Sequence, residues 1–347
     1  MLGVRDKSFD ALKGLAIVFV VAIHSLNTGW GAVGDYAELN LYATLFIGQV
    51  YLFAVPAFFF VSGYFVGDLA THRNTWVAFV FPRAERLILP YIIWSLFFSL
   101  KSGVRDPVDM LWLLATGGAM GPYYFVVVLF CFVVLAPFFH KNLEQKFLFP
   151  MLLAGTFVWL CIVYSLRIIR PNGIDWQIVA LPFWTWLVFY VFGMKVASIE
   201  RAGGVVWGGG LQASVLFVIA ALVISWVEAF SLLFAFGLKS GAGSAIKFSS
   251  YIYSTAVIVL FLELRKTRRE WPTVFVFLGS WSFGIYLIHE QVRVFVTRLF
   301  EKVLGLYDVQ PIFQLSVVLG VLVFSVVLIL IARSVLPSKI ASKYLGF

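Results

Sequence analysis

Apolar residues run almost without interruption through about ten stretches of the chain, each long enough to cross the roughly 30 Å hydrocarbon core of a bilayer as a helix. The runs are continuously apolar and do not alternate with polar residues, which excludes the strands of a membrane β-barrel. The pattern therefore predicts an all-α polytopic membrane protein with about ten transmembrane helices. The expected spans are residues 10–26, 43–66, 84–100, 123–139, 147–165, 178–196, 211–236, 249–264, 273–290 and 312–333.

Composition and charge support this prediction and orient the chain. Hydrophobic residues make up 62% and charged residues 12% of the sequence, against about 25% charged residues in soluble domains. Most Lys and Arg residues lie between the spans on the side of the N-terminus, most densely in RKTRRE, residues 265–270. The positive-inside rule then places both termini in the cytoplasm. Topology and anionic lipid explain the net charge of +9 better than nucleic acid does.

The chain shows no linker or low-complexity boundary, so residues 1–347 are expected to form a single transmembrane domain. Cys131 and Cys161 fall inside predicted helices, where they are expected to be packing residues and not metal ligands or a disulfide. The glycines of RAGGVVWGGGLQ, residues 201–212, lack the preceding strand and the following Lys-Ser/Thr of a phosphate-binding loop. They are interpreted as a cytoplasmic loop.

The first span carries two polar residues on one helical face. His24 follows Lys13 by three helical turns, about 16 Å along the axis, and Asp10 lies near the same face. With Lys13 at the inner boundary, His24 lies in the outer half of the membrane. A polar side chain there is costly and must face a cavity or a partner. It either bonds a neighbouring helix for packing alone or has a function.

The next two spans contain features for close packing and for anion binding. In VPAFFFVSGYF, residues 55–65, Pro56 is expected to kink the helix and Ser62-Gly63 to let another backbone approach closely. In FPRAERLILPYIIW, residues 81–94, Arg83 and Arg86 share one face at the cytoplasmic boundary. They either anchor the helix at the headgroups or bind phosphate.

The predicted outer half contains carboxylates and a second histidine. Glu228 lies about 25 Å from the inner end of its span, and the ninth span ends in SFGIYLIHEQV with Tyr286, His289 and Glu290. Cations on the inner side suit an anionic cytoplasmic donor. A neutral imidazole on the outer side suits removal of a proton from a hydroxyl.

Four stretches in this order resemble the integral-membrane acyltransferase family 3: RDKSFDALKGLAIVFVVAIH, FAVPAFFFVSGYF, PRAERLILPYIIW and SFGIYLIH. Members of that family O-acylate envelope sugars, most commonly from acetyl-CoA. The resemblance implies that Lys13 and His24 match the family's basic residue, usually Arg, and its essential histidine. Lys at this place is similar to the branch of fucose 4-O-acetylases, and it offers a point charge where Arg offers a bidentate fork. The other matching positions are Ser62, Gly63, Arg83, Arg86, Tyr286 and His289.

Residues and resemblance together predict an O-acetyltransferase in the bacterial cytoplasmic membrane, without a metal. Acetyl-CoA would present its phosphates to Lys13, Arg83 and Arg86, in a donor site that includes Ser62-Gly63, and would carry its thioester toward His24. His24 would act as general base on a hydroxyl of an envelope or exported polysaccharide or a glycolipid, or would take the acyl group briefly.

The supporting acid and the competing functions stay open at this stage. Glu228 or Glu290 would orient the imidazole as the acid of a triad does, with His289 as a second catalytic candidate. A transporter or flippase for a small solute or lipid-linked sugar would instead use His24, Glu228 and His289 as a proton relay. A purely structural membrane protein is the third reading. Nothing in the sequence sets the acceptor sugar, the acyl group or the oligomeric state.

Overall fold

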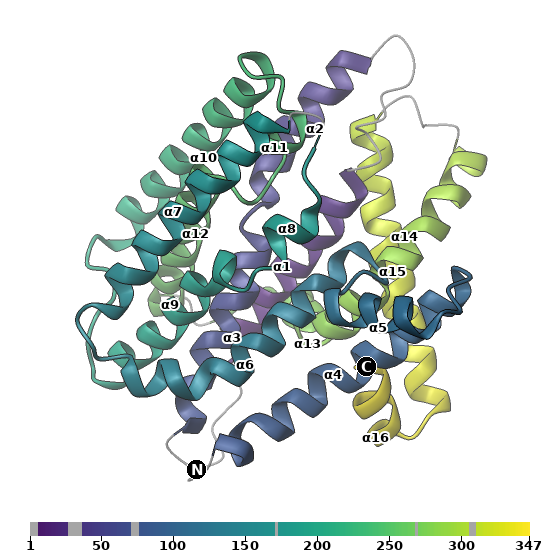
Figure 1. The fold of residues 1–347 in the computed structure, drawn as a ribbon, viewed down its shortest axis with the longest axis horizontal. Coiled ribbons are helices and arrows are strands. Elements are labelled where there is room, and N and C mark those ends of the chain that lie inside the picture. The colour runs from purple at the N-terminus through teal and green to yellow at the C-terminus, as the bar shows by residue number, and fades with distance from the viewer. Residues whose placement is uncertain (1–5, 27–36, 71–75, 171–172, 268–269, 305–309) are drawn as a thin grey trace. The chain divides into compact units, whose positions relative to one another are not determined.

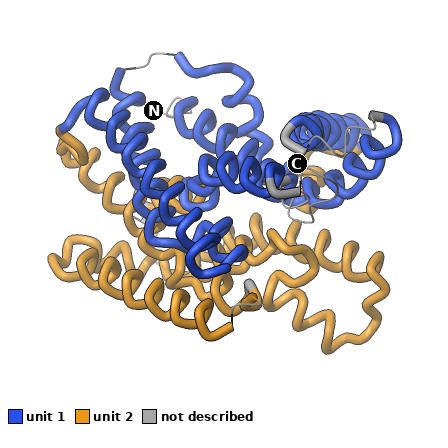
Figure 2. Tube along the Cα trace, turned by 90° about the horizontal axis from the view of Figure 1, so that it is seen from above, with its two compact units in different colours: residues 1–57, 209–335 blue, residues 58–208, 336–347 orange. Residues whose placement is uncertain are grey.

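The computed structural model describes residues 6–26, 37–70, 76–170, 173–267, 270–304 and 310–347, and the regular elements within these ranges are helical (Figure 1). The all-α prediction is therefore confirmed. The chain divides into two compact units, each built from stretches that are separate in sequence (Figure 2). Unit 1 comprises residues 1–57 and 209–335, and unit 2 comprises residues 58–208 and 336–347.

Each unit contains both long and short helices. Those of unit 1 are α1 (Lys7–Leu26), α2 (Ala37–Tyr51), the start of α3 (Ala54–Ala70), α10 (Gly210–Phe234), α11 (Lys239–Ala242), α12 (Phe248–Thr267), α13 (Thr273–Ser280), α14 (Ser282–Leu304) and α15 (Gln310–Val335). Those of unit 2 are the rest of α3, α4 (Trp76–Lys101), α5 (Pro107–Thr116), the 3-10 turn η2 (Gly121–Tyr123), α6 (Tyr124–Asn142), α7 (Leu148–Ile169), α8 (Trp176–Ala180), α9 (Trp184–Arg201), α16 (Ser338–Ile340) and the π-turn η3 (Ala341–Leu345).

Within the described residues, eight stretches are long and apolar enough to cross a membrane. They are Lys7–Ser25, Leu39–Val66, Gly121–Asn142, Leu148–Ile169, Gln177–Arg201, Gly210–Phe234, Phe248–Thr267 and Ile312–Val335. They coincide with eight of the predicted spans, so the chain is a polytopic membrane protein. The two remaining predicted spans, 84–100 and 273–290, lie in helices that are more highly charged or interrupted.

The second predicted span, 43–66, is two helices and not one kinked helix. α2 ends at Tyr51 and α3 begins at Ala54, so Pro56 lies in the first turn of α3. A proline is well tolerated there, because the first N–H groups of a helix have no intrahelical acceptor. The chain therefore breaks just before the proline, at residues 52–53, instead of bending at it.

The third and ninth predicted spans also differ from expectation. α4 begins at Trp76, eight residues before the predicted start, and continues through both Pro82 and Pro90. The stretch 273–290 was predicted as one helix, but it breaks at Trp281 between α13 and α14, and α14 continues to Leu304. His289 therefore lies well inside α14 and not at the end of a span.

In unit 1, α1 packs against α13, α14 and α15 (Figure 1). Its contact with α13 is backbone against backbone. A Cβ built on Gly14 would lie 1.9 Å from the Phe275 carbonyl oxygen, and one built on Gly279 would lie 1.7 Å from the Asp10 carbonyl oxygen. Only glycine allows two helices to approach this closely. This contact fixes α13, and hence the start of α14, relative to α1.

In unit 2, α3 and α9 approach each other through a similar pair of glycines. A Cβ on Gly63 would lie 1.9 Å from the Tyr190 carbonyl oxygen, and one on Gly193 would lie 2.1 Å from that of Phe60. The close backbone approach expected at Gly63 is thus observed, and its partner is α9. At the C-terminal end of the chain, the Trp94 indole N–H donates to the Leu345 carbonyl at 3.1 Å, which holds η3 against α4.

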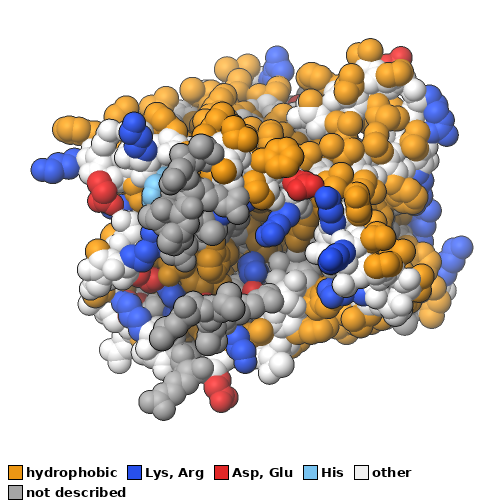
Figure 3. All heavy atoms as spheres, turned by 90° about the horizontal axis from the view of Figure 1, so that it is seen from below, with side chains coloured by type: hydrophobic (Ala, Val, Ile, Leu, Met, Phe, Trp, Pro, Cys, Tyr) orange, Lys and Arg blue, Asp and Glu red, His pale blue; other side chains and the backbone are white. Residues whose placement is uncertain are grey.

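Large apolar side chains stay exposed on helices of both units. Met151 and Phe157 on α7 are 70% and 60% exposed, and Leu216 on α10 and Leu319 on α15 are 66% and 65% exposed. Apolar atoms also cover much of the face drawn in Figure 3. Exposure on this scale is unfavourable in water, so these helix faces are expected to contact lipid.

Candidate active site

The structure brings His24 and His289 together inside unit 1. His24 lies near the end of α1 and His289 lies two turns into α14, and their ring centroids are 5.3 Å apart with the planes tilted by 47°. The break at Trp281 and the close α1–α13 contact aim α14 so that the two imidazoles meet. Two histidines far apart in sequence thus form one pair.

His289 has a defined tautomer. Its ring is fully buried, and Nδ1 lies 2.6 Å from the Tyr286 carbonyl oxygen. A carbonyl oxygen can only accept, so Nδ1 donates and carries the proton, and Nε2 of the neutral ring holds a lone pair. In the part of the chain that the structure describes, His289 Nε2 has no hydrogen-bond partner. A buried base without a partner indicates a functional group, since such atoms are otherwise costly.

An ion pair stands beside the histidines. Arg293 donates to both carboxylate oxygens of Glu290, at 2.9 and 2.6 Å, and both side chains are mostly buried. Glu290 and Arg293 both act electrostatically on His24 and on His289. Arg293 was missed in the sequence analysis, although its spacing from Glu290 in EQVR is that of a helical i,i+3 pair.

Glu228 contacts the start of a helix. Its Oε2 accepts the Ser249 backbone N–H at 2.9 Å, in the first turn of α12, where a carboxylate stabilises the unpaired N–H groups and the helix dipole. The bond to the Ser249 N–H explains how the Glu228 carboxylate is stabilised this far along its apolar helix. Its predicted role in orienting an imidazole stays a prediction.

A buried polar cluster near Glu228 was not foreseen. Lys247 is fully buried, and its Nζ donates to Gln49 Oε1 at 2.6 Å and to Ser225 Oγ at 3.3 Å. Gln49 Nε2 in turn donates to the Ala242 carbonyl at 3.3 Å. These bonds offset the cost of burying an ammonium and connect α2, α10 and the segment before α12.

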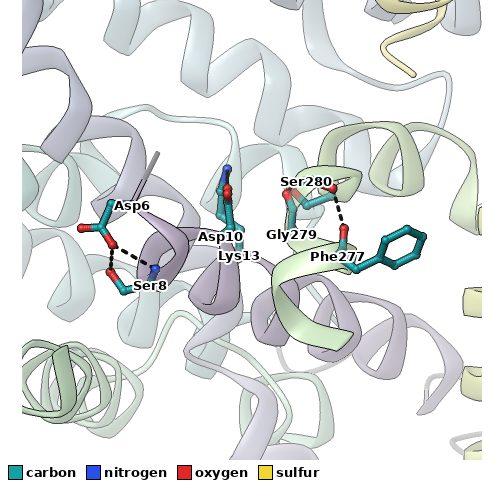
Figure 4. A network of polar contacts seen from close by, with 8 residues as sticks. Asp6, Ser8, Asp10, Lys13, Phe277, Gly279 and Ser280 are labelled. Carbon is teal, nitrogen blue, oxygen red and sulfur yellow. Dashed lines mark hydrogen bonds and ion pairs between the residues drawn. The ribbon is translucent and has the colours of Figure 1, made fainter. Parts of the chain in front are cut away.

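Lys13 lies on α1 three turns before His24, as its spacing predicts. Its Nζ forms a 2.8 Å ion pair with Asp10, and 27% of the side chain is exposed. Figure 4 shows both residues beside Gly279 and Ser280 of α13. Because Asp10 already partners the ammonium, Lys13 offers less net positive charge to a ligand than a lone cation would.

The other predicted donor-binding residues lie in unit 2. The Arg83 guanidinium donates to the Phe79 carbonyl at 2.8 Å and lies 4.1 Å above the Phe79 ring. Arg86, one turn further along α4, is exposed. Gly63 is used in the contact between α3 and α9. In the described ranges, no three His, Cys, Asp or Glu side chains are placed to hold a metal ion.

These features define a polytopic membrane protein in which α1 and α14 bring two histidines together. Its family follows from the sequence match: residues 6–332 match the acyltransferase domain of acyltransferase family 3. The chain therefore belongs to this family, and its class is that of a membrane acyltransferase. No curated protein matches the chain, and no solved structure does.

Proposed function

We propose that the protein transfers an acetyl or similar short acyl group from cytoplasmic acyl-CoA to a hydroxyl of an envelope or exported polysaccharide or a glycolipid, in the bacterial cytoplasmic membrane. The observation that carries this proposal is the His24–His289 pair in a chain of the acyltransferase family. Acyl transfer to a hydroxyl needs a base to take the hydroxyl proton. A neutral histidine supplies one.

In the proposed reaction, the acceptor oxygen attacks the thioester carbonyl while His24 takes the hydroxyl proton. The carbon–sulfur bond breaks, coenzyme A leaves as a thiolate, and the proton is returned to its sulfur. In the two-step variant, His24 first takes the acyl group as an acyl-imidazole and releases coenzyme A, and the acceptor then displaces the imidazole. His289, whose ring centroid lies 5.3 Å from that of His24, would serve as the second proton carrier.

The carboxylate best supported as a partner of the imidazoles is Glu290, since it acts electrostatically on both rings. It stabilises an imidazolium formed during proton transfer, while Arg293 keeps it ionised and fixed. The alternative, Glu228, rests on its depth in the sequence alone, and its bond to Ser249 supports a structural role.

For the donor, we propose that its phosphates bind to the basic residues predicted for this purpose. Arg86 has the exposure that a ligand needs, and Arg83 is held in place by its bond to Phe79. A guanidinium suits phosphate because it can donate two parallel hydrogen bonds. Lys13 contributes less, since Asp10 partners it.

The test is transfer of labelled acetyl from acetyl-CoA to envelope polysaccharide in membranes that contain equal amounts of wild-type protein, His24→Ala or His140→Ala. Removing a general base should lower the rate at least about 100-fold, so His24→Ala should be nearly inactive. His140, near the end of α6, is the matched control and should tolerate replacement.

Two results would contradict the proposal. Near wild-type transfer by His24→Ala would remove the base assignment. If no label moves with the wild-type protein although its natural polysaccharide is present, the donor is wrong or the protein is a carrier. Uptake driven by a proton gradient without acetyl-CoA would then establish the carrier function.

A further inference from the structure

Thr297, in the second half of α14, buries a hydroxyl that the fold does not use. Its side chain is 9% exposed, and among the described residues its Oγ1 has no hydrogen-bond partner. Hydroxyls inside helices commonly donate to the carbonyl four residues earlier, and those of Thr255 and Ser316 do so at 2.9 Å. Valine would fill the place of Thr297 without the cost of an unpaired hydroxyl. The hydroxyl is therefore expected to meet a group that binds to the protein.

α14 carries a second buried group of this kind on the same side. His289 Nε2 also lacks a partner in the part of the chain that the structure describes. Thr297 follows His289 by eight residues, which is about 12 Å along the axis and about 80° around it. Arg293 lies between them and turns its guanidinium to Glu290. One ligand of sufficient length could thus contact both unpaired groups.

The contact with α15 fixes the rotation of α14 at this level. A Cβ built on Gly320 of α15 would lie 2.7 Å from Val296 Cγ1 and 3.0 Å from Phe300 Cζ. A contact this close leaves α14 no room to turn about its axis. Val296 faces Gly320, and Thr297 is the next residue along α14. Thr297 therefore stays on the side of α14 adjacent to the one that meets α15.

The contacts of α1 show on which side of the histidines Thr297 lies. Gly279, near the end of α13, meets the Asp10 carbonyl near the start of α1, and His289 meets His24 near the end of α1. α14 therefore runs along α1 in the same direction, and Thr297 lies beyond the histidine pair. With the N-terminus in the cytoplasm, as the positive-inside rule predicts, this is the outer side. An envelope polysaccharide would approach from there, and a cytoplasmic donor from the opposite side.

We propose that the Thr297 hydroxyl binds a sugar hydroxyl of the acceptor, on the sugar unit next to the one that is acylated at His24. A threonine hydroxyl both donates and accepts, as a sugar hydroxyl does, so the two can pair in either direction. A separation of about 12 Å is more than one sugar ring spans, so the contact falls on the neighbouring unit. This inference rests on the proposed function and adds that the acceptor contains at least two linked sugars.

The experiment compares Thr297→Val with wild type as purified full-length protein in nanodiscs. The acceptor probe is the envelope polysaccharide of the cells from which the protein comes, freed of acetyl esters by mild base, and the donor is labelled acetyl-CoA. Thr297→Val should raise the KM for polysaccharide about 3- to 10-fold, the loss of one neutral hydrogen bond. The kcat and the KM for acetyl-CoA should not change, because the bond is remote from the reacting atoms and contributes equally before and during transfer.

Two further comparisons test the position of the contact. With single sugars released from the same polysaccharide by acid, wild type and Thr297→Val should have the same kcat/KM, since one ring does not reach Thr297. Thr297→Ser keeps the hydroxyl and should keep the wild-type KM for polysaccharide.

Thr255→Val is the matched control, because it makes the same change on α12 of the same unit. It removes the bond to the Tyr251 carbonyl, so it should lower the unfolding temperature and leave the KM for polysaccharide unchanged. Unliganded Thr297→Val should unfold at the same temperature as wild type or higher, since it loses no bond within the protein.

Three results would count against these conclusions, and they differ from one another. A KM for polysaccharide within twofold of wild type in Thr297→Val would overturn the inference, and a lower unfolding temperature would then show that the hydroxyl serves the fold. A raised KM for acetyl-CoA, with that for polysaccharide unchanged, would overturn it by placing Thr297 on the donor side. Wild type that transfers no acetyl group to the polysaccharide would instead contradict the proposed function itself.

Discussion

At the scale of single residues, two imidazoles meet inside unit 1, and their environments differ. The Nδ1–H of His289 is used by the Tyr286 carbonyl, and a backbone carbonyl, not a carboxylate, therefore fixes its tautomer. Because the ring is held in this way, its lone pair points in one direction only. In the proposed mechanism, this arrangement would orient the base through a neutral acceptor and would leave the Glu290 charge to stabilise the protonated state.

Two substitutions separate a proton-carrying role of His289 from a structural one. In His289→Asn, the amide can still donate to the Tyr286 carbonyl in place of Nδ1, while His289→Gln places its amide near the position of Nε2. Neither amide can take up a proton at neutral pH, so both variants should lose about 100-fold in transfer rate. The measurement is labelled acetyl transfer at equal protein levels. Wild-type rates in His289→Asn, with loss only in His289→Gln, would show that the histidine serves packing.

At the scale of helices, glycine contacts and helix breaks decide where the side chains go. α1 and α13 touch through their backbones at Gly14 and Gly279, and the break at Trp281 lets α14 leave in its own direction. A continuous helix over 273–290 would carry His289 along the axis of α13. The break at Trp281 is therefore needed to bring His289 to His24.

This construction predicts a strong effect of Gly279→Ala. The new Cβ would meet the Asp10 carbonyl group, a backbone atom set that cannot move aside, and overpacking of this kind costs about 1–3 kcal/mol. The variant should unfold at lower temperature and lose transfer activity, since α14 would shift with α13. Gly155→Ala on α7 is the control, because nothing lies within 4 Å of its new Cβ. Unchanged stability and activity in Gly279→Ala would contradict the proposed coupling.

At the scale of the whole molecule, the membrane is the solvent that explains the exposed apolar helices and the charge distribution. α4 is the segment on which the topology depends. α4 is not one of the eight apolar stretches found in the described residues. If neither α4 nor residues 273–290 crossed the membrane, however, the basic loop 265–270 would lie on the outer side. The positive-inside rule therefore favours a crossing by α4.

Cysteine labelling tests this orientation. Cys131 and Cys161 are first replaced by Ser, and single cysteines are introduced as Ser102→Cys and Thr267→Cys, both at exposed positions. An impermeant maleimide added to intact cells should label Ser102→Cys, while Thr267→Cys should react only after the membrane is opened. Labelling of Thr267→Cys in intact cells, with Ser102→Cys protected, would show that α4 does not cross.

Sequence alone determined the class of the protein and most of its helices, because length and continuous apolarity are local properties that each segment carries by itself. It also determined the family through motifs around Lys13, His24 and Arg83. The break at residues 52–53 could have been anticipated from Pro56, since proline favours a first turn. The break at Trp281 has no comparable local signal.

Only the tertiary structure decided which polar residues meet. The pairing of His24 with His289 and the burial of Lys247 against Gln49 both depend on contacts between distant helices. So does the burial of the Tyr190 hydroxyl, which has no hydrogen-bond partner among the described residues. A hydropathy scale assigns each residue type one transfer free energy, which does not depend on whether the side chain faces a partner, a ligand site or lipid. The direction of each helix face is set by packing, and packing follows from close contacts such as those of Gly14, Gly63 and Gly279.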